Sequence, residues 1–175
     1  MNMGYQILAT SARRFALRPA LLGQWGEYSY GQLEMRVARL AGGLVRLGIR
    51  PGDRVAFMMN NHPDVVIAYF AILRIGAIAV AANVMLKRDE LAYLLNDSET
   101  GTIICESVAV DSVMAAGKQT PSLKNIVLAG DAHRDDLVTI KALEAGEPLP
   151  EVVDRAPDDV AMMLYTSGTT GSPRA

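Results

Sequence analysis

The residues with the clearest chemistry lie in the last stretch of the chain. Met162 to Ala175 reads MMLYTSGTTGSPRA, an apolar run followed by residues that are almost all Thr, Ser, Gly, Pro or Arg. The hydroxyl side chains in this run can donate hydrogen bonds to a bound ligand. Four of them, on Thr166, Ser167, Thr169 and Thr170, fall within five residues. Hydroxyl groups spaced this closely are suited to contact the oxygens of an anion.

Two glycines and one arginine add to this pattern. Gly168 and Gly171 permit positive φ and let backbone N–H groups approach a ligand without an intervening Cβ. Arg174 supplies a fixed positive charge whose planar guanidinium suits phosphate oxygens, and Pro173 stiffens the exit of the loop. Because the carboxyl ends of parallel strands face the ligand crevice, a strand that leads into this loop predicts a phosphate site over residues 165–175. A hydroxyl-rich surface turn is the alternative that these residue types leave open.

Two common nucleotide-binding signatures are absent from the sequence. A Walker A loop has four residues between its glycines, followed by Lys and Ser or Thr, whereas only two residues separate Gly168 from Gly171. The dinucleotide pattern G-x-G-x-x-G is also missing. The predicted loop is therefore of another kind.

Alternating helices and strands are predicted ahead of the loop. From Tyr30, apolar residues recur at spacings of three and four, which predicts an amphipathic helix that ends at Gly48. These residues are Leu33, Val37, Leu40, Leu44 and Leu47. The next apolar run predicts a helix from Pro63 to Arg74, capped by Asn61 and followed by a break at Gly76.

The remaining elements complete the same alternation. Further helices are predicted near residues 89–95, 108–116 and 137–144, and strands near 55–59, 78–80, 102–105, 125–128 and 160–165. Strands that are apolar throughout, separated by helix-length segments, predict an α/β fold. We expect a mostly parallel sheet with helices on both faces, in a single domain over residues 1–175 with the loop at its C-terminal end.

Composition and charge point to small molecules as ligands. Hydrophobic residues make up 50% of the chain, charged residues make up 21%, and the net charge is -2, which gives no reason to expect nucleic acid as a partner. Cys105 is the only cysteine, so the chain can form no internal disulfide and no thiol cluster for a metal. Its apolar neighbours predict a buried strand residue.

The N-terminal stretch and one long apolar run bear on location. Residues 1–26 contain Arg13, Arg14 and Arg18 and no acidic residue, which is the composition of a weak organelle transit peptide. The simpler interpretation is a short amphipathic helix that uses Ile7, Leu8, Phe15 and Leu17. No apolar stretch of signal-peptide length precedes Arg13, so we expect a cytoplasmic protein. The run 65–86 is long enough for a membrane span, but Arg74 interrupts it, and we expect no span.

Neither histidines nor paired acids suggest a second site. His62 lies at a predicted helix start and His133 in a polar loop, with no partners at ligand spacing. The pairs 135–136 and 158–159 are aspartates that precede apolar segments, which is typical of caps and solvated loops. We therefore expect no metal ligand and no catalytic residue within this chain.

The terminal motif and two upstream segments resemble a known family. YTSGTTGSPRA resembles the phosphate-loop signature of the adenylate-forming superfamily, Tyr-Thr-Ser-Gly-Thr-Thr-Gly-x-Pro-Lys-Gly, and nine of its ten specified positions are identical or conservative. The segments YSYGQLEMRVARLAGGLVRLGIRPGDRVAFMMNNHPD and AYFAILRIGAIAVAANVMLKRDELAYLLNDSETGTIIC are similar to N-terminal segments of the same family. Three positions depart from the pattern: Arg174 replaces the usual Lys, Ala175 replaces Gly, and Ala81 replaces a common proline.

The resemblance implies an activity for the complete enzyme. Members, which include acyl-CoA synthetases and acid–CoA ligases, activate a carboxylic acid with ATP and Mg²⁺ to form an acyl-adenylate, and the ligases then pass the acyl group to CoA. The small-molecule partners are thus a carboxylic acid, ATP and CoA, with fatty acid metabolism as one setting. The positions that match the loop would bind the ATP phosphates. They are Thr166, Ser167, Gly168, Thr169, Thr170, Gly171 and Arg174.

The resemblance also implies that much of the machinery lies outside these residues. Family members place the adenine, ribose and Mg²⁺ contacts and a catalytic lysine further along the chain. We therefore expect the N-terminal part of a larger adenylate-forming fold, inactive alone and prone to self-association through apolar faces. The alternatives are a truncated nucleotide- or protein-binding module without turnover and the N-terminal part of a nonribosomal adenylation domain.

Overall fold

The computed structural model describes residues 3–167 and 173–174 of the chain. The helices are α1 (Met3–Phe15), α2 (Tyr30–Arg46), α3 (Pro63–Arg74), α4 (Arg88–Asp97), the 3-10 helix η1 (Ser107–Ala109), α5 (Val110–Gly117) and α6 (Ile140–Glu144). The strands are β1 (Pro19–Gly23), β2 (Gly26–Ser29), β3 (Arg54–Met58), β4 (Ile78–Ala81), β5 (Thr102–Cys105), β6 (Asn125–Leu128), β7 (Val138–Thr139), β8 (Met162–Leu164), β9 (Thr166–Ser167) and β10 (Pro173–Arg174).

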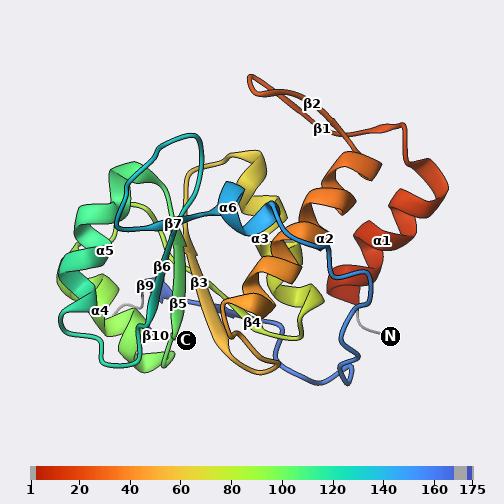
Figure 1. The fold of residues 1–175 in the computed structure, drawn as a ribbon. Helices are drawn as coiled ribbons and strands as arrows, with labels where there is room; N and C mark the ends of the chain where they lie inside the picture. The colour runs from red at the N-terminus through yellow and green to blue at the C-terminus, as the bar shows by residue number, and fades with distance from the viewer. Residues whose placement is uncertain (1–2, 168–172, 175) are drawn as a thin grey trace.

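Six of the strands form one parallel sheet in the order β7-β6-β5-β3-β4-β8, as Figure 1 shows. The chain adds β4 on one side of β3 and then returns to add β5 on the other side. Strand order therefore reverses between β3 and β5. The predicted α/β class with a mostly parallel sheet is confirmed.

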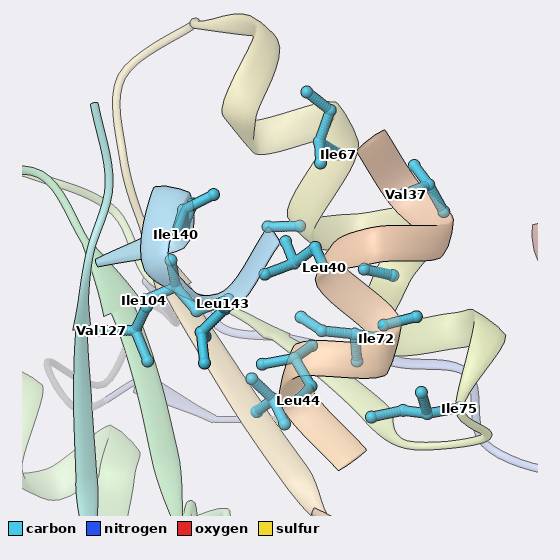
Figure 2. Close-up of a cluster of buried hydrophobic side chains, with 14 of the residues drawn as sticks. Val37, Leu40, Leu44, Ile67, Ile72, Ile75, Ile104, Val127, Ile140 and Leu143 are labelled. Atoms are coloured by element: carbon cyan, nitrogen blue, oxygen red, sulfur yellow. The ribbon is translucent and has the colours of Figure 1, made fainter. Parts of the chain in front are cut away.

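Helices cover both faces of the sheet, as predicted. Alternate residues of β5 point to opposite faces: Ile104 packs in the core cluster under α2, α3 and α6, while Ile103 and Cys105 pack in the cluster under α4 and α5. Figure 2 shows the first cluster, in which Leu40 and Leu44 of α2 lie among side chains from α3, α6 and the sheet. The helices on each face bury apolar side chains against the sheet, so the sheet is enclosed on both sides.

The start of α3 differs from the sequence prediction. His62, and not Asn61, is the N-cap: its Nδ1 accepts a hydrogen bond of 3.2 Å from the backbone N–H of Asp64. Pro63 occupies the first turn, where its missing N–H costs nothing. Imidazole is an uncommon cap, and the sequence pattern favoured the asparagine one position earlier.

The N-terminal prediction is only partly correct. Helix α1 forms and buries Leu8, but it ends at Phe15, and Leu17 lies beyond it with 93% of its surface exposed. Residues 19–29 form an antiparallel hairpin, β1–β2, that the sequence analysis missed. Its strands are short and mostly exposed, so they lack the continuous apolar pattern of the sheet strands.

The connection over residues 146–159 is held against the helices by Arg74. This side chain is only 6% exposed; its Nε and Nη2 each donate a 2.8 Å hydrogen bond, to the carbonyls of Leu149 and Pro150, and its Nη1 lies 2.7 Å from Glu34. The backbone N–H of Val153 donates to the carbonyl of Arg74. The connection thus reaches β8 along a fixed path. Within the described residues, no helix is long and apolar enough to cross a membrane.

Candidate functional site

The proposed phosphate loop begins at the carboxyl edge of the parallel sheet. Strand β8 pairs with β4, with Ala79 opposite Met162 and Ala81 opposite Leu164. Tyr165 and Thr166 therefore leave the sheet beside the end of β4, where open parallel sheets hold their ligands. The strand predicted over residues 160–165 is confirmed, although it is shorter, spanning Met162–Leu164.

Three of the predicted phosphate-binding residues lie in one small hairpin. Strand β9 pairs antiparallel with β10, so that Ser167 lies opposite Pro173 and Thr166 opposite Arg174. The register brings the first hydroxyl residues of the motif and its arginine together, although six residues separate Ser167 from Arg174 in the sequence. The other predicted contacts, Gly168, Thr169, Thr170 and Gly171, lie outside the described residues.

Tyr165 is fixed by a hydrogen bond that the sequence analysis did not foresee. Its hydroxyl donates to Oδ2 of Asp97 at the end of α4, with 2.7 Å between the oxygens. Burial of the ring, followed by the hydrogen bond to the Asp97 carboxylate, raises the pKa of Tyr165 above its usual value. Tyr165, the residue before the hydroxyl-rich motif, is thus held against α4. Its place as the last residue of the strand predicted over residues 160–165 was the only signal for it.

A pocket lies between the ends of β3, β4 and β8. It has a volume of about 380 Å³ and is lined by Met59, Asn60, Asn61, Ala81, Ala82, Asn83, Val84, Leu164 and Tyr165. Its polar groups are therefore asparagine amides and the tyrosine that precedes the loop. Asn83 uses its side-chain oxygen to accept from the backbone N–H of Met85, at 2.9 Å, which fixes the turn after β4.

The ends of β3 and β5 are joined by Glu106. Its carboxylate accepts hydrogen bonds from both the backbone N–H of Asn60, at 2.5 Å, and the Asn60 side-chain amide, at 3.0 Å. These two strands are the neighbours at which strand order reverses. The glutamate thus holds together the two loops that diverge at this point.

A buried ionic network fixes α3 against the loop after β6. Asp64 is 4% exposed; it accepts from Arg36 at 2.9 Å and from the backbone N–H of Gly130 at 3.1 Å, and Arg36 also pairs with Glu144 at 2.9 Å. Burial lowers the pKa of Arg36, but the hydrogen bonds and charges of Glu144 and Asp64 outweigh it and raise the pKa overall. The network links α2, α3 and α6 and keeps its charges paired, as buried charges require.

The residues expected to be structural behave as such. His62 caps α3, and His133 pairs with Asp135 at the surface, with 2.9 Å between its Nε2 and the carboxylate. Cys105 is fully buried, and burial, with a smaller effect from Glu106, raises the pKa of its thiol to about 12. Over residues 3–167 and 173–174, no group of three or more His, Cys, Asp or Glu side chains could hold a metal ion.

Comparisons with known proteins point to one family. The sequence model of the family described as AMP-binding enzyme matches residues 8–175. The 3-hydroxybenzoate–CoA ligase of Aromatoleum sp. (strain CIB) is 31% identical over all of this chain and 34% of its own length. The medium/long-chain-fatty-acid–CoA/3-oxocholest-4-en-26-oate–CoA ligase of Mycolicibacterium smegmatis is 33% identical over 90% of this chain and 29% of its own.

A solved structure gives the same result for the fold. The anthranilate CoA ligase AuaEII, in complex with anthranoyl-AMP, superposes with a TM-score of 0.92 at 26% identity, over 97% of this chain and 33% of that one. The chain thus spans about a third of the length of the relatives it matches.

Proposed function

This chain belongs to the AMP-binding enzyme family, and from this premise we propose that it is the N-terminal part of an ATP-dependent acid–CoA ligase. The two curated relatives described above are both CoA ligases, and the solved relative carries an acyl-adenylate. In the proposed reaction a carboxylate attacks the α-phosphate of ATP, pyrophosphate leaves, and the acyl group of the adenylate passes to the thiol of CoA.

The proposed part of this chain in the reaction is to bind the β- and γ-phosphates. Phosphoryl transfer depends mainly on positioning and on stabilising charge, which suits a loop of hydroxyls, backbone N–H groups and one arginine. The observation that carries the proposal is the register of β9 and β10, which brings Thr166 and Arg174 opposite each other at the carboxyl edge of the sheet. The proposal assigns the Mg²⁺ contacts to later segments of the complete enzyme.

The nature of the acid is the least constrained part of the proposal. The relatives are named for hydroxybenzoate, fatty acid and anthranilate, so aromatic and fatty acids are the substrate classes to test first. A cytoplasmic location and a single domain over residues 1–175 belong to the same proposal. Cell fractionation and limited proteolysis test these two points.

Pyrophosphate exchange tests the activity. In the complete ligase we expect exchange between ATP and pyrophosphate that depends on an added acid such as 3-hydroxybenzoate or a fatty acid. Ser167→Ala should remove about 1–3 kcal/mol of transition-state stabilisation, which lowers the rate by roughly ten- to a hundredfold. Ser112→Ala, on α5, is the control and should leave the rate unchanged.

Experiments on the isolated chain test whether it binds ATP without catalysing the exchange. Residues 1–175 alone should catalyse no exchange, because they supply phosphate contacts without the rest of the site. ATP should still raise their melting temperature, since a ligand at a hundred times its Kd adds about 2.7 kcal/mol of stability. Exchange by the isolated chain that Ser167→Ala abolishes would contradict the assignment of catalysis to later segments. A complete protein with no acid-dependent exchange would contradict the ligase proposal itself.

A further inference from the structure

A second pocket lies at the point where the strand order of the sheet reverses. It has a volume of about 300 Å³ and is formed by residues after β3, β5 and β6 and by the tip of the β1–β2 hairpin. Its lining includes Trp25, Asn61, His62, Glu106, Ser107 and Asp131. Because α3 follows β3 on one face of the sheet and α5 follows β5 on the other, the loops between them separate and leave a crevice.

This pocket shares Met59, Asn60 and Asn61 with the pocket beside the proposed phosphate loop, but it extends from them in the opposite direction across the sheet. The crevice opens above β3 and β5, whereas the loop follows β8, and β4 lies between β3 and β8. In open parallel sheets, a strand-order reversal is the usual place for a small-molecule site. The volume is at the lower end of the range for such sites. The fold therefore provides a ligand position that the ligase proposal leaves without a role.

An aromatic side chain from a distant part of the chain covers the crevice. Trp25, in the turn of the hairpin, packs edge-on against His62 with 5.7 Å between the ring centroids. Figure 1 shows the hairpin reaching from α1 across the end of the molecule at which α3 begins. A Cβ on Gly23 would come within 2.5 Å of the Trp25 ring, so this glycine allows the ring to fold back over the hairpin. The indole remains 39% exposed, which leaves part of it free to contact a ligand.

The polar groups of the crevice are held in place by their other contacts. Both oxygens of Glu106 accept hydrogen bonds from Asn60, which fixes the carboxylate. His62 accepts at Nδ1 from the backbone N–H of Asp64, which fixes the orientation of its ring. The fixed carboxylate and the fixed ring therefore line the same pocket as Trp25. Such preorganisation lowers the entropy cost of binding.

The charge of the lining selects the kind of ligand. Glu106 and Asp131 contribute two carboxylates, and no lysine or arginine is among the lining residues. The crevice therefore disfavours phosphates and carboxylates, including ATP and the acid substrate. Carboxylates beside an indole favour a cation that can also contact an aromatic face. From this arrangement we infer that the crevice beneath Trp25 is a binding site for a small alkylammonium cation that carries an aromatic or heteroaromatic ring.

Fluorescence of Trp25 reports directly on this site, because it is the only tryptophan in the chain. The probe is histamine, and its matched comparison is imidazole-4-acetate, in which a carboxylate replaces the terminal CH2–NH3⁺ unit. We expect histamine to change the fluorescence along a saturable curve and imidazole-4-acetate to give no saturable change. Linear quenching by histamine, or equal binding of the two compounds, would overturn the inference.

Three variants place the binding at the crevice. Glu106→Gln should weaken histamine binding about tenfold, the size expected when an ionised hydrogen-bond acceptor becomes neutral. Asp131→Asn, at an exposed position, should weaken it in the same direction and is not expected to disturb the fold. Asp135→Asn lies in the same loop but outside the pocket and should change nothing. An equal effect of Asp135→Asn, or none from Asp131→Asn, would rule out the proposed site whatever the outcome of the exchange assay.

Discussion

At the scale of single residues, Tyr165 shows how the candidate site is anchored. Tyr165→Phe removes its 2.7 Å hydrogen bond to Asp97 and should lower the free energy of unfolding by about 1 kcal/mol, as measured by urea denaturation. Tyr93→Phe is the matched control, because Tyr93 lies on α4, the helix that also carries Asp97, and its side chain is 41% exposed. If the site depends on this anchor, Tyr165→Phe should also weaken the stabilisation of the chain by ATP. Equal effects of the two variants would contradict a special role for Tyr165.

The pKa of Tyr165 adds a pH dependence to this prediction. Because burial and Asp97 raise this pKa, the folded state retains the proton at a pH at which the unfolded chain loses it. The resulting stability is fully present below about pH 10, the range of an unperturbed tyrosine, and is lost as the pH rises further. Stability curves of the wild type and of Tyr165→Phe should therefore converge at alkaline pH. Parallel curves would show that the folded state does not hold the Tyr165 proton to higher pH than the unfolded chain does.

Cys105 gives a second test at this scale. Its thiol is fully buried and its pKa is raised from 9.0 to about 12, so the thiolate is scarce in the native state. We expect slow labelling by a thiol reagent at pH 8, at a rate set by opening of the fold, and immediate labelling in urea. The associated stability is present below pH 9 and is lost as the pH rises toward 12. Fast labelling of the folded chain would contradict the buried position.

At the scale of elements, Arg74 holds the connection that leads to β8 in place. Arg74→Met leaves Glu34 and two carbonyls without their donor and should cost about 3 kcal/mol, because one partner of a buried ion pair is removed. Arg46→Met, which removes hydrogen bonds to the carbonyls of Leu143 and Glu147, is the more exposed comparison and should cost about 1 kcal/mol. Urea denaturation measures both. Trypsin should also cleave the Arg74→Met variant faster within residues 146–159.

Elements with a strong pattern could be predicted from the sequence, and weakly patterned ones could not. The helix from Tyr30 was found because its buried residues follow one stripe, and it ends at Arg46, close to the predicted Gly48. The β1–β2 hairpin was missed because its short strands bury little apolar surface. The contacts from Tyr165 to Asp97 and from Glu106 to Asn60 join distant segments, and no local pattern encodes such pairs. Residue types predicted the loop, but only the fold places it beside β4.

At the scale of the whole molecule, the outer edge of β8 is a candidate surface for self-association of the chain. Strand β8 is last in the order of the six-stranded sheet, and Leu164 is 60% exposed there. Edge strands with exposed apolar residues tend to pair with other chains. We expect light scattering to detect self-association of the chain at high concentration and Leu164→Lys to reduce it. Val138→Lys, on β7 at the opposite edge, is the comparison, and an equal reduction there would contradict an interface at β8.

The pairing of Ala79 with Met162 also has a consequence for how the molecule is made. On the ribosome, β3 to β7 emerge first and can assemble. One edge of β4 stays unpaired until its partner β8, which is encoded much later, has emerged. Parallel pairing across so long a separation forms slowly, because the loop must close before any contact compensates for it. We therefore expect β8 to dock last in refolding experiments. The strand that carries the proposed phosphate loop would then complete the sheet as the final step of folding.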